Sequence, residues 1–235
     1  MRPIRFYLPR LMCFLLSGCS STSSSNIESE LWRMDSFESI GNAAVSVEGN
    51  PQLRKSPYGI AIYFDGDGDR LIIDKNPLTG ADEFTIEIMF NPADAYPENV
   101  EPRFVHIEAL DAPSRRITIE LRLNDKNQWY LDAYIKSGHS QLTLIDPAKV
   151  HPVGRWAHAA ITYKNREFSS YVNRMRELTG AVEFLPIAPT AKTSVGARMN
   201  RIHWFKGEIA IVRITRRALE PEEFLSLTNG QVIPH

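Results

Sequence analysis

Two neighbouring stretches of this chain alternate apolar and polar residues so regularly that they restrict it to β structure. In residues 117–123 and 129–136 every second side chain is apolar. A period of two is typical of a strand with one buried face. Residues 124–128, between the two stretches, have the composition of a turn. We therefore expect an antiparallel hairpin with one face in the core.

The polar side chains of this expected hairpin share its opposite face. They are Glu120, Arg122, Tyr130, Asp132, Tyr134 and Lys136. Carboxylates and guanidinium groups pair with sugar hydroxyls, and tyrosine rings stack on the apolar faces of sugars. The sequence therefore predicts a carbohydrate-binding surface formed by these six residues. A solvated sheet face with cross-strand ion pairs is the alternative.

Further short apolar stretches, separated by turn signals, indicate many more strands. They lie at residues 60–64, 71–73, 84–90, 103–108, 141–145, 157–163, 168–173, 193–196 and 208–214. So many short strands indicate a β-sandwich. The stretch 208–214 is apolar on both sides, which predicts a central strand. Pro221 is placed to begin a short C-terminal helix.

Three sequence blocks resemble the laminin-G-like, concanavalin A-like lectin/glucanase jelly-roll family. They are YFDGDGD with FTIEI, then WAHAAITY, then VGAR with FKGEI, in the family's order. The resemblance covers residues 30–228 and implies an all-β, antiparallel two-sheet sandwich. Two positions depart from the family pattern. Arg174 replaces a turn glycine, and Ala210 replaces an acidic residue near a calcium site of related folds.

The N-terminus has the features of a lipoprotein signal. Residues 1–18 contain three arginines and a short apolar run, and residues 16–19 resemble the bacterial lipobox. We expect Cys19 to carry the lipid, residues 19–29 to form a serine-rich tether, and residues 30–235 to form one jelly-roll domain. Serine after Cys19 favours an outer membrane. An ordinary signal peptide is the alternative, and in both cases the chain is exported.

Charge and cysteine content limit the possible partners. Removal of residues 1–18 takes away Arg2, Arg5 and Arg10, so 24 basic residues face 28 acidic ones and the net charge is −4. This charge argues against nucleic acid as a ligand. The two cysteines, Cys13 and Cys19, leave the domain without a disulfide or a thiolate metal site. Nothing in the sequence indicates a cofactor.

Asp65, Asp67 and Asp69 are spaced like the start of an EF-hand calcium loop. That loop also needs glycine at its sixth position and glutamate at its twelfth, where this chain has Arg70 and Asn76. We therefore expect no metal site. The aspartates fit a glycine-rich hairpin turn, in which their side chains accept hydrogen bonds from nearby backbone amides.

The sequence lacks complete catalytic motifs. Glu87 and Glu120 each stand alone on their strands, which argues against a retaining glycosidase. Fragments around Arg122 and Tyr134 resemble alginate-lyase motifs, in which arginine neutralises the uronate and tyrosine transfers the proton. The first motif lacks its leading arginine, which would stand at Thr118.

These observations favour a binding protein over an enzyme. We expect an envelope-anchored, non-catalytic carbohydrate-binding lipoprotein with no catalytic residues. A protein-binding adhesion module of the same fold is the first alternative. A polysaccharide lyase that acts on a uronate polymer is the second.

Overall fold

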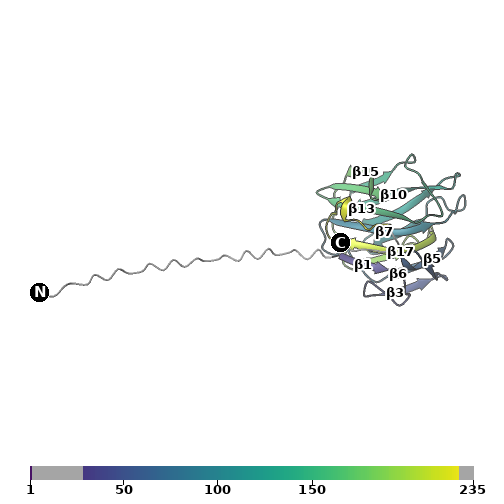
Figure 1. The fold of residues 1–235 in the computed structure, drawn as a ribbon, viewed down its shortest axis with the longest axis horizontal. Helices are drawn as coiled ribbons and strands as arrows, with labels where there is room; N and C mark the ends of the chain where they lie inside the picture. Colours follow the sequence, from purple (N-terminus) through teal and green to yellow (C-terminus); the bar gives the residue numbers. More distant parts are fainter. Residues whose placement is uncertain (2–28, 228–235) are drawn as a thin grey trace.

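The protein folds into a sandwich of two antiparallel β-sheets, which face each other across one core (Figure 1). The structure is a computed structural model and describes residue 1 and residues 29–227. Cys19 and the expected signal lie outside the described residues. Within these residues there is no helix long and apolar enough to cross a membrane.

The first sheet has eight strands. Their spatial order is β15 (Met175–Ala181), β14 (Glu167–Val172), β13 (Ala157–Lys164), β7 (Phe84–Pro92), β17 (Lys206–Thr215), β5 (Gly59–Asp65) and β4 (Gln52–Ser56), and β1 (Ser29–Arg33) pairs with the second half of β17. The position of β17 between β7 and β5 confirms the prediction that it is a central strand.

The second sheet has nine strands. Their order is β11 (Ser140–Ile145), β10 (Gln128–Ser137), β9 (Arg115–Leu123), β8 (Arg103–Glu108), β16 (Lys192–Val195), β6 (Arg70–Ile73), β3 (Ala43–Glu48) and β2 (Ser39–Ile40), and β12 (His151–Pro152) pairs with the start of β10. Strands β9 and β10 form the predicted hairpin. Its apolar side chains are buried, and its polar side chains lie on the outer face.

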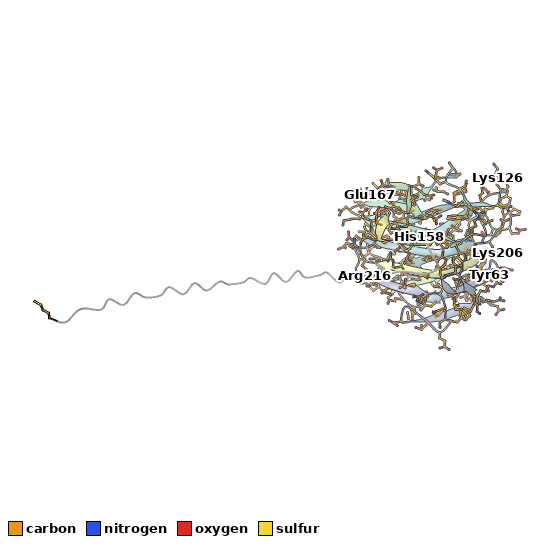
Figure 2. All side chains as sticks on the ribbon, in the orientation of Figure 1. Tyr63, Lys126, His158, Glu167, Lys206 and Arg216 are labelled. Carbon is orange, nitrogen blue, oxygen red and sulfur yellow. The ribbon has the colours of Figure 1, made fainter. Side chains whose placement is uncertain are left out.

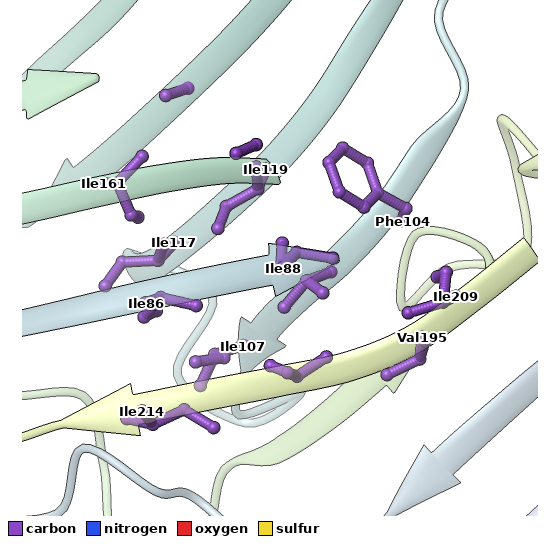
Figure 3. Packing of buried hydrophobic residues seen from close by; sticks show 14 of the residues in the cluster. Ile86, Ile88, Phe104, Ile107, Ile117, Ile119, Ile161, Val195, Ile209 and Ile214 are labelled. Carbon is purple, nitrogen blue, oxygen red and sulfur yellow. The ribbon is translucent and has the colours of Figure 1, made fainter. Parts of the chain in front are cut away.

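The core is built from apolar side chains of both sheets (Figure 3). Phe90 of β7 lies 4.8 Å from Phe104 of β8 and 5.2 Å from Trp129 of β10, measured between ring centroids. Phe205, just before β17, lies 5.6 Å from Phe104. These aromatic contacts join the two sheets, and each is worth about 0.5–1.5 kcal/mol beyond the apolar area that it buries.

A β-bulge in β8 allows Phe104 to enter this core. Strict alternation would place Phe104 on the outer face, because Val105 and Ile107 of the same strand point inward. The register shifts between Arg103 and Val105, so Phe104 turns inward and Arg103 pairs with Glu120 of β9. The bulge thereby moves a guanidinium group to the outer face of the second sheet.

A C-terminal strap, residues 217–225, covers the outer face of the first sheet. It contains the 3-10 turn η1 (Pro221–Glu223), which stands where the sequence indicated a short helix. Its Phe224 packs against His158 of β13 and Tyr171 of β14. The hydroxyl of Thr85 on β7 accepts a hydrogen bond from Leu219 N and donates one to Arg217 O. The strap therefore spans three neighbouring strands.

Beneath the strap lies a buried charged cluster centred on Glu87. Its carboxylate, 0% exposed, lies 3.0 Å from His158 Nε2 and accepts hydrogen bonds from Leu225 N at 2.6 Å and from Arg213 Nε. Figure 2 labels His158 near the middle of the domain. His158 is fully buried and contacts both Glu87 and Phe224, so it packs between the sheet and the strap.

The turn between β14 and β15 is built without the family's glycine. Asn173 has a φ of 49° and Arg174 a φ of 69°, so both residues adopt the left-handed conformation that this tight turn needs. Arg174 also donates hydrogen bonds to Pro221 O and Glu222 O of the strap. The arginine therefore replaces the glycine and adds an attachment for the strap.

The aspartate-rich segment is a corner between the sheets rather than the hairpin turn expected from the sequence. It connects β5 of the first sheet to β6 of the second. Asp69 accepts hydrogen bonds from Asp65 N at 2.9 Å and Asn50 N at 2.6 Å, and Asp65 accepts one from Asp67 N at 2.7 Å. The expected backbone hydrogen bonds are therefore present. Within the described residues no group of three His, Cys, Asp or Glu side chains is placed to hold a metal ion.

We predict that Glu87→Ala lowers the free energy of unfolding by about 3–5 kcal/mol, because it leaves Arg213 buried without its partner. Burial raises the pKa of Glu87, but hydrogen bonds from His158 and Arg213 outweigh burial and hold it below 4.5. The stabilisation is therefore present at neutral pH and is lost as pH falls through that lowered pKa.

Urea denaturation measures this effect, and Glu83→Ala is the control. Glu83 forms a 2.9 Å ion pair with the exposed Lys164, so its loss should cost at most about 1 kcal/mol. Equal losses in the two variants would contradict the central role of Glu87.

Candidate functional site

The strand register gathers polar side chains on the outer face of the second sheet. Arg103, Glu120 and Asp132 lie opposite one another across β8, β9 and β10. Alternate residues of a strand share a face, so the next row, Thr118 opposite Tyr134, lies beside the first. Sequence alternation predicts which face each residue occupies, and the register determines its neighbours.

These rows surround a cavity of about 170 Å³, which we call the second-sheet pocket. It is lined by Arg103, Arg116, Thr118, Glu120, Arg122, Asp132, Tyr134, Thr143 and Arg198. Its volume is below the roughly 300–1,000 Å³ of pockets for drug-sized ligands. The pocket therefore suits one sugar unit or one substituent of a longer chain.

Four of the six residues predicted from the sequence line this pocket, namely Glu120, Arg122, Asp132 and Tyr134. Tyr130 and Lys136 lie on the same face but outside the lining. Their role in binding stays a prediction.

Sequence reasoning missed the other five lining residues, among them Arg103 and Arg198. A signal existed for Arg103, because the adjacent apolar residues Phe104 and Val105 interrupt the alternation and indicate a bulge. Arg198 lies in the loop between β16 and β17, where no periodic pattern indicates a side-chain direction.

Two carboxylates form the recessed part of the pocket. Glu120 is 4% exposed and Asp132 is 1% exposed. Arg103 Nε lies 2.8 Å from Glu120 Oε2, and Arg122 Nε donates a 2.7 Å hydrogen bond to Asp132 Oδ2. Glu101, at the edge of the face, lies 2.7 Å from Arg122 Nη1. The carboxylates therefore hold the arginines in place through their Nε atoms.

The environment of this carboxylate pair shifts both pKa values upward. Burial, followed by the charge of Asp132, raises the pKa of Glu120 to about 7. Burial also raises the pKa of Asp132, although its hydrogen bond with Arg122 opposes the change. Glu120 is therefore partly protonated near neutral pH. The sequence analysis noted that Glu120 stands alone on its own strand. It missed the pair because Asp132 lies on the neighbouring strand.

A carboxylate pair with raised pKa values can serve acid–base chemistry where substrate reaches both groups. Here both side chains are almost fully buried behind the arginines. The groups that a ligand meets first are Arg116, Arg122, Tyr134 and Arg198, all half-buried, and the exposed Thr143. A ligand that enters the pocket therefore meets guanidinium groups before it meets the carboxylates.

Tyr134 is held by two contacts. Its hydroxyl donates a hydrogen bond to Gln141 Oε1 at 3.0 Å, and the guanidinium carbon of Arg116 lies 5.2 Å from its ring centroid. The cation–π contact orients the ring at the edge of the pocket. The hydroxyl is thus already engaged outside the pocket lining.

The backbone at Arg198 is held by hydrogen bonds from buried residues of the domain. His106, fully buried on β8, accepts a 2.9 Å hydrogen bond from Met199 N through Nδ1. Burial, followed by the charge of Arg198, lowers the pKa of His106 to about 3, so the ring is neutral and can accept this bond. Arg70 donates hydrogen bonds to Arg198 O at 3.2 Å and Met199 O at 2.8 Å. The loop is held in one position before any ligand binds.

Two antiparallel sheets that pack face to face define a β-sandwich of the jelly-roll class. Residues 65–224 match the sequence profile described as the concanavalin A-like lectin/glucanases superfamily, and the chain belongs to this superfamily. The family and the fold class expected from the sequence are thereby confirmed. No curated protein sequence matches the chain.

Several solved structures share the fold. Domain 4 of AbnA, a GH43 extracellular arabinanase from Geobacillus stearothermophilus, in complex with arabinotriose, is 19% identical with a TM-score of 0.63, over 83% of this chain and 96% of that one. The binding domain of botulinum neurotoxin DC in complex with SialylT is 19% identical, with a TM-score of 0.59 over 83% and 49%.

The binding domain of Paraclostridial Mosquitocidal Protein 1 is 15% identical, with a TM-score of 0.60 over 83% of this chain and 50% of that one. This chain therefore spans about half the length of the two toxin domains. At such low identities the likeness shows the fold alone.

We predict that the Glu120 carboxyl titrates near pH 7 and that Asp132→Asn moves its pKa downward, because the variant removes a neighbouring negative charge. NMR of carbon-13-labelled glutamate measures this titration. Asp125→Asn, in the exposed loop of the same hairpin, should leave it unchanged. An ordinary glutamate pKa in the wild type would contradict the predicted upward shift.

The same shift predicts a pH dependence of stability. A carboxyl whose folded pKa is raised stabilises the fold at low pH and loses this contribution as pH rises. Between pH 4.5 and about 7 the free energy of unfolding of the wild type should fall by up to about 3 kcal/mol relative to Glu120→Gln. Urea titrations across this range measure the difference, and parallel pH profiles would contradict the assignment.

Proposed function

We propose that this protein is an exported, non-catalytic carbohydrate-binding lipoprotein and that the second-sheet pocket is its sugar site. The observation that carries the proposal is the pocket itself, in which guanidinium groups, threonine hydroxyls and a tyrosine ring converge on one face. Carbohydrates offer hydroxyls that accept hydrogen bonds from such donors and ring faces that stack on tyrosine.

Membership of a lectin/glucanase superfamily supports a glycan ligand in general. Two structures of the same fold were solved with ligands named arabinotriose and SialylT. Superfamily membership alone does not define a ligand, because one fold carries many functions. The assignment of a sugar site to this chain therefore depends on the residues of the pocket.

The contacts within the pocket favour binding over the lyase alternative. In that chemistry Arg122 would neutralise a uronate and Tyr134 would move a proton. The Tyr134 hydroxyl donates a hydrogen bond to Gln141, which lies outside the pocket lining. The group that would move the proton is therefore already engaged, so a lyase reaction has less support.

We further propose that Cys19 carries the lipid anchor and that the protein faces away from the cytoplasm on a bacterial envelope, with an outer membrane favoured. This part of the proposal depends on the lipobox-like residues 16–19. Mass spectrometry of the membrane-extracted protein tests it. An N-terminal peptide that begins at an unmodified residue other than Cys19 would contradict it.

To test the sugar site, a soluble form of residues 20–235, which contains every strand of both sheets, is passed over immobilised neutral and acidic polysaccharides. We expect selective retention, which Tyr134→Ala weakens roughly tenfold because the ring forms part of the pocket wall. Tyr96→Ala is the control, since Tyr96 is exposed in the loop between β7 and β8 and lies outside the pocket lining.

Retention of no polysaccharide would contradict the proposal and favour a protein partner. An equal loss of retention in the two tyrosine variants would show that the sugar site does not lie in the pocket. Release of unsaturated sugar products by the wild type, abolished by Tyr134→Phe, would support the lyase instead.

A further inference from the structure

We infer that the second-sheet pocket selects a sugar that carries an anionic group, a carboxylate or a sulfate, and that Arg198 receives this group together with Arg116 and Arg122. The inference rests on the proposed sugar-binding function and goes further by naming the class of sugar. It depends on how charge is distributed between the recessed and the accessible parts of the pocket.

The carboxylates of the pocket are recessed and the guanidinium groups at its opening are accessible. Glu120 and Asp132 are almost fully buried, whereas Arg116, Arg122 and Arg198 are half-buried at the opening. A site for a neutral sugar needs acceptors within reach of the sugar hydroxyls. A ligand that enters this pocket meets guanidinium N–H groups first, and these complement an anion.

The guanidinium groups at the opening retain unused donors. The Nε of Arg122 donates to Asp132 and its Nη1 lies 2.7 Å from Glu101, and within residues 29–227 its Nη2 donates no hydrogen bond. The guanidinium of Arg198 has no hydrogen-bond or ion-pair partner in the same part of the chain. Planar guanidinium groups with free terminal nitrogens match carboxylate and sulfate oxygens.

The loop that carries Arg198 is preorganised for binding. His106 and Arg70 pin the backbone of Arg198 and Met199 from inside the domain. A loop that is ordered before binding loses less conformational entropy when the ligand arrives. The unpaired guanidinium is therefore held at the pocket rather than carried on a freely moving segment.

The charges around the pocket favour an anion. Four guanidinium groups line it against two carboxylates, and burial keeps one of these, Glu120, partly protonated near neutral pH. Two further acids, Glu101 and Glu108, lie close to the arginines at its edge. Glu108 is nearly buried and its pKa is raised, chiefly by burial. Lys136 adds a positive charge on the same face.

The experiment compares each acidic polymer with its own neutral form. The soluble form of residues 20–235 is tested on polygalacturonate and on its methyl ester, and on a sulfated polymer and its desulfated form. We expect retention of at least one acidic form, preference over its neutral form, and release by salt, since ion pairing at an exposed site is screened. The two polymer pairs distinguish a carboxylate from a sulfate.

Arg198→Ala should weaken retention of the acidic polymer roughly tenfold to a hundredfold, the value of one or two charge-assisted hydrogen bonds. Arg201→Ala is the matched control. Arg201 is in the same loop and carries the same charge, but it pairs with Glu48 at 3.0 Å and lies outside the pocket lining. Arg198 makes no side-chain hydrogen bond within the described residues, so its variant should melt like the wild type.

Equal or stronger retention of the neutral forms would overturn the anionic specificity and leave the sugar-binding proposal intact. Equal weakening by Arg198→Ala and Arg201→Ala would overturn the assignment to Arg198. Retention of no polymer, acidic or neutral, would contradict the sugar-binding function itself and this inference with it.

Discussion

The packing of Phe104 between the sheets is the interaction on which the rest of this structure depends. Phe104 contacts Phe90 of the first sheet and Phe205 before β17, so it joins the two layers at the centre of the core. To bring it there, β8 bulges, and the bulge turns Arg103 outward. The same local change that completes the core therefore supplies one wall of the pocket on the opposite face.

The sequence predicted every strand that has more than one buried residue. It missed β1, β2, β3, β4, β12 and β15, each of which has at most one buried residue. The hairpin of β9 and β10 was predicted in full because its alternation is unbroken. Strand β15 was missed because it lies at a sheet edge, half-exposed, and its residues follow no apolar period. Strand β4, at the other edge of the sheet, was missed for the same reason.

The composition of the pocket was only partly predictable for a related reason. Alternation assigns Glu120 and Asp132 to one face, but it does not say that they stand opposite each other, because register depends on the turn and on packing. The position of Arg198 depends on bonds from His106 and Arg70, which are far away in the sequence. Such long-range hydrogen bonds produce no periodic pattern in the sequence.

Two buried glutamates differ in protonation because their surroundings differ. One has a structural role, and the other lies in the candidate site. Glu87 accepts three hydrogen bonds from three different residues, and these donors keep it ionised despite complete burial. Among the residues that the structure describes, Glu120 forms an ion pair with Arg103 alone. Burial and the charge of Asp132 raise its pKa, so its proton is retained to a higher pH. A chain can thus use one residue type as a fixed anchor on one sheet and as a titratable group on the other.

The strap has a consequence for how the domain can come apart. A sheet ordinarily opens from its edge, one strand at a time, and β14 and β15 form such an edge in the first sheet. Residues 217–225 lie across this direction, bound to the β14–β15 turn through Arg174, to β7 through Glu87 and to β17 through Arg213. The edge hairpin can separate from the sheet only after the strap has been released. The strap therefore makes the opening of the sheet edge cooperative with the opening of its centre.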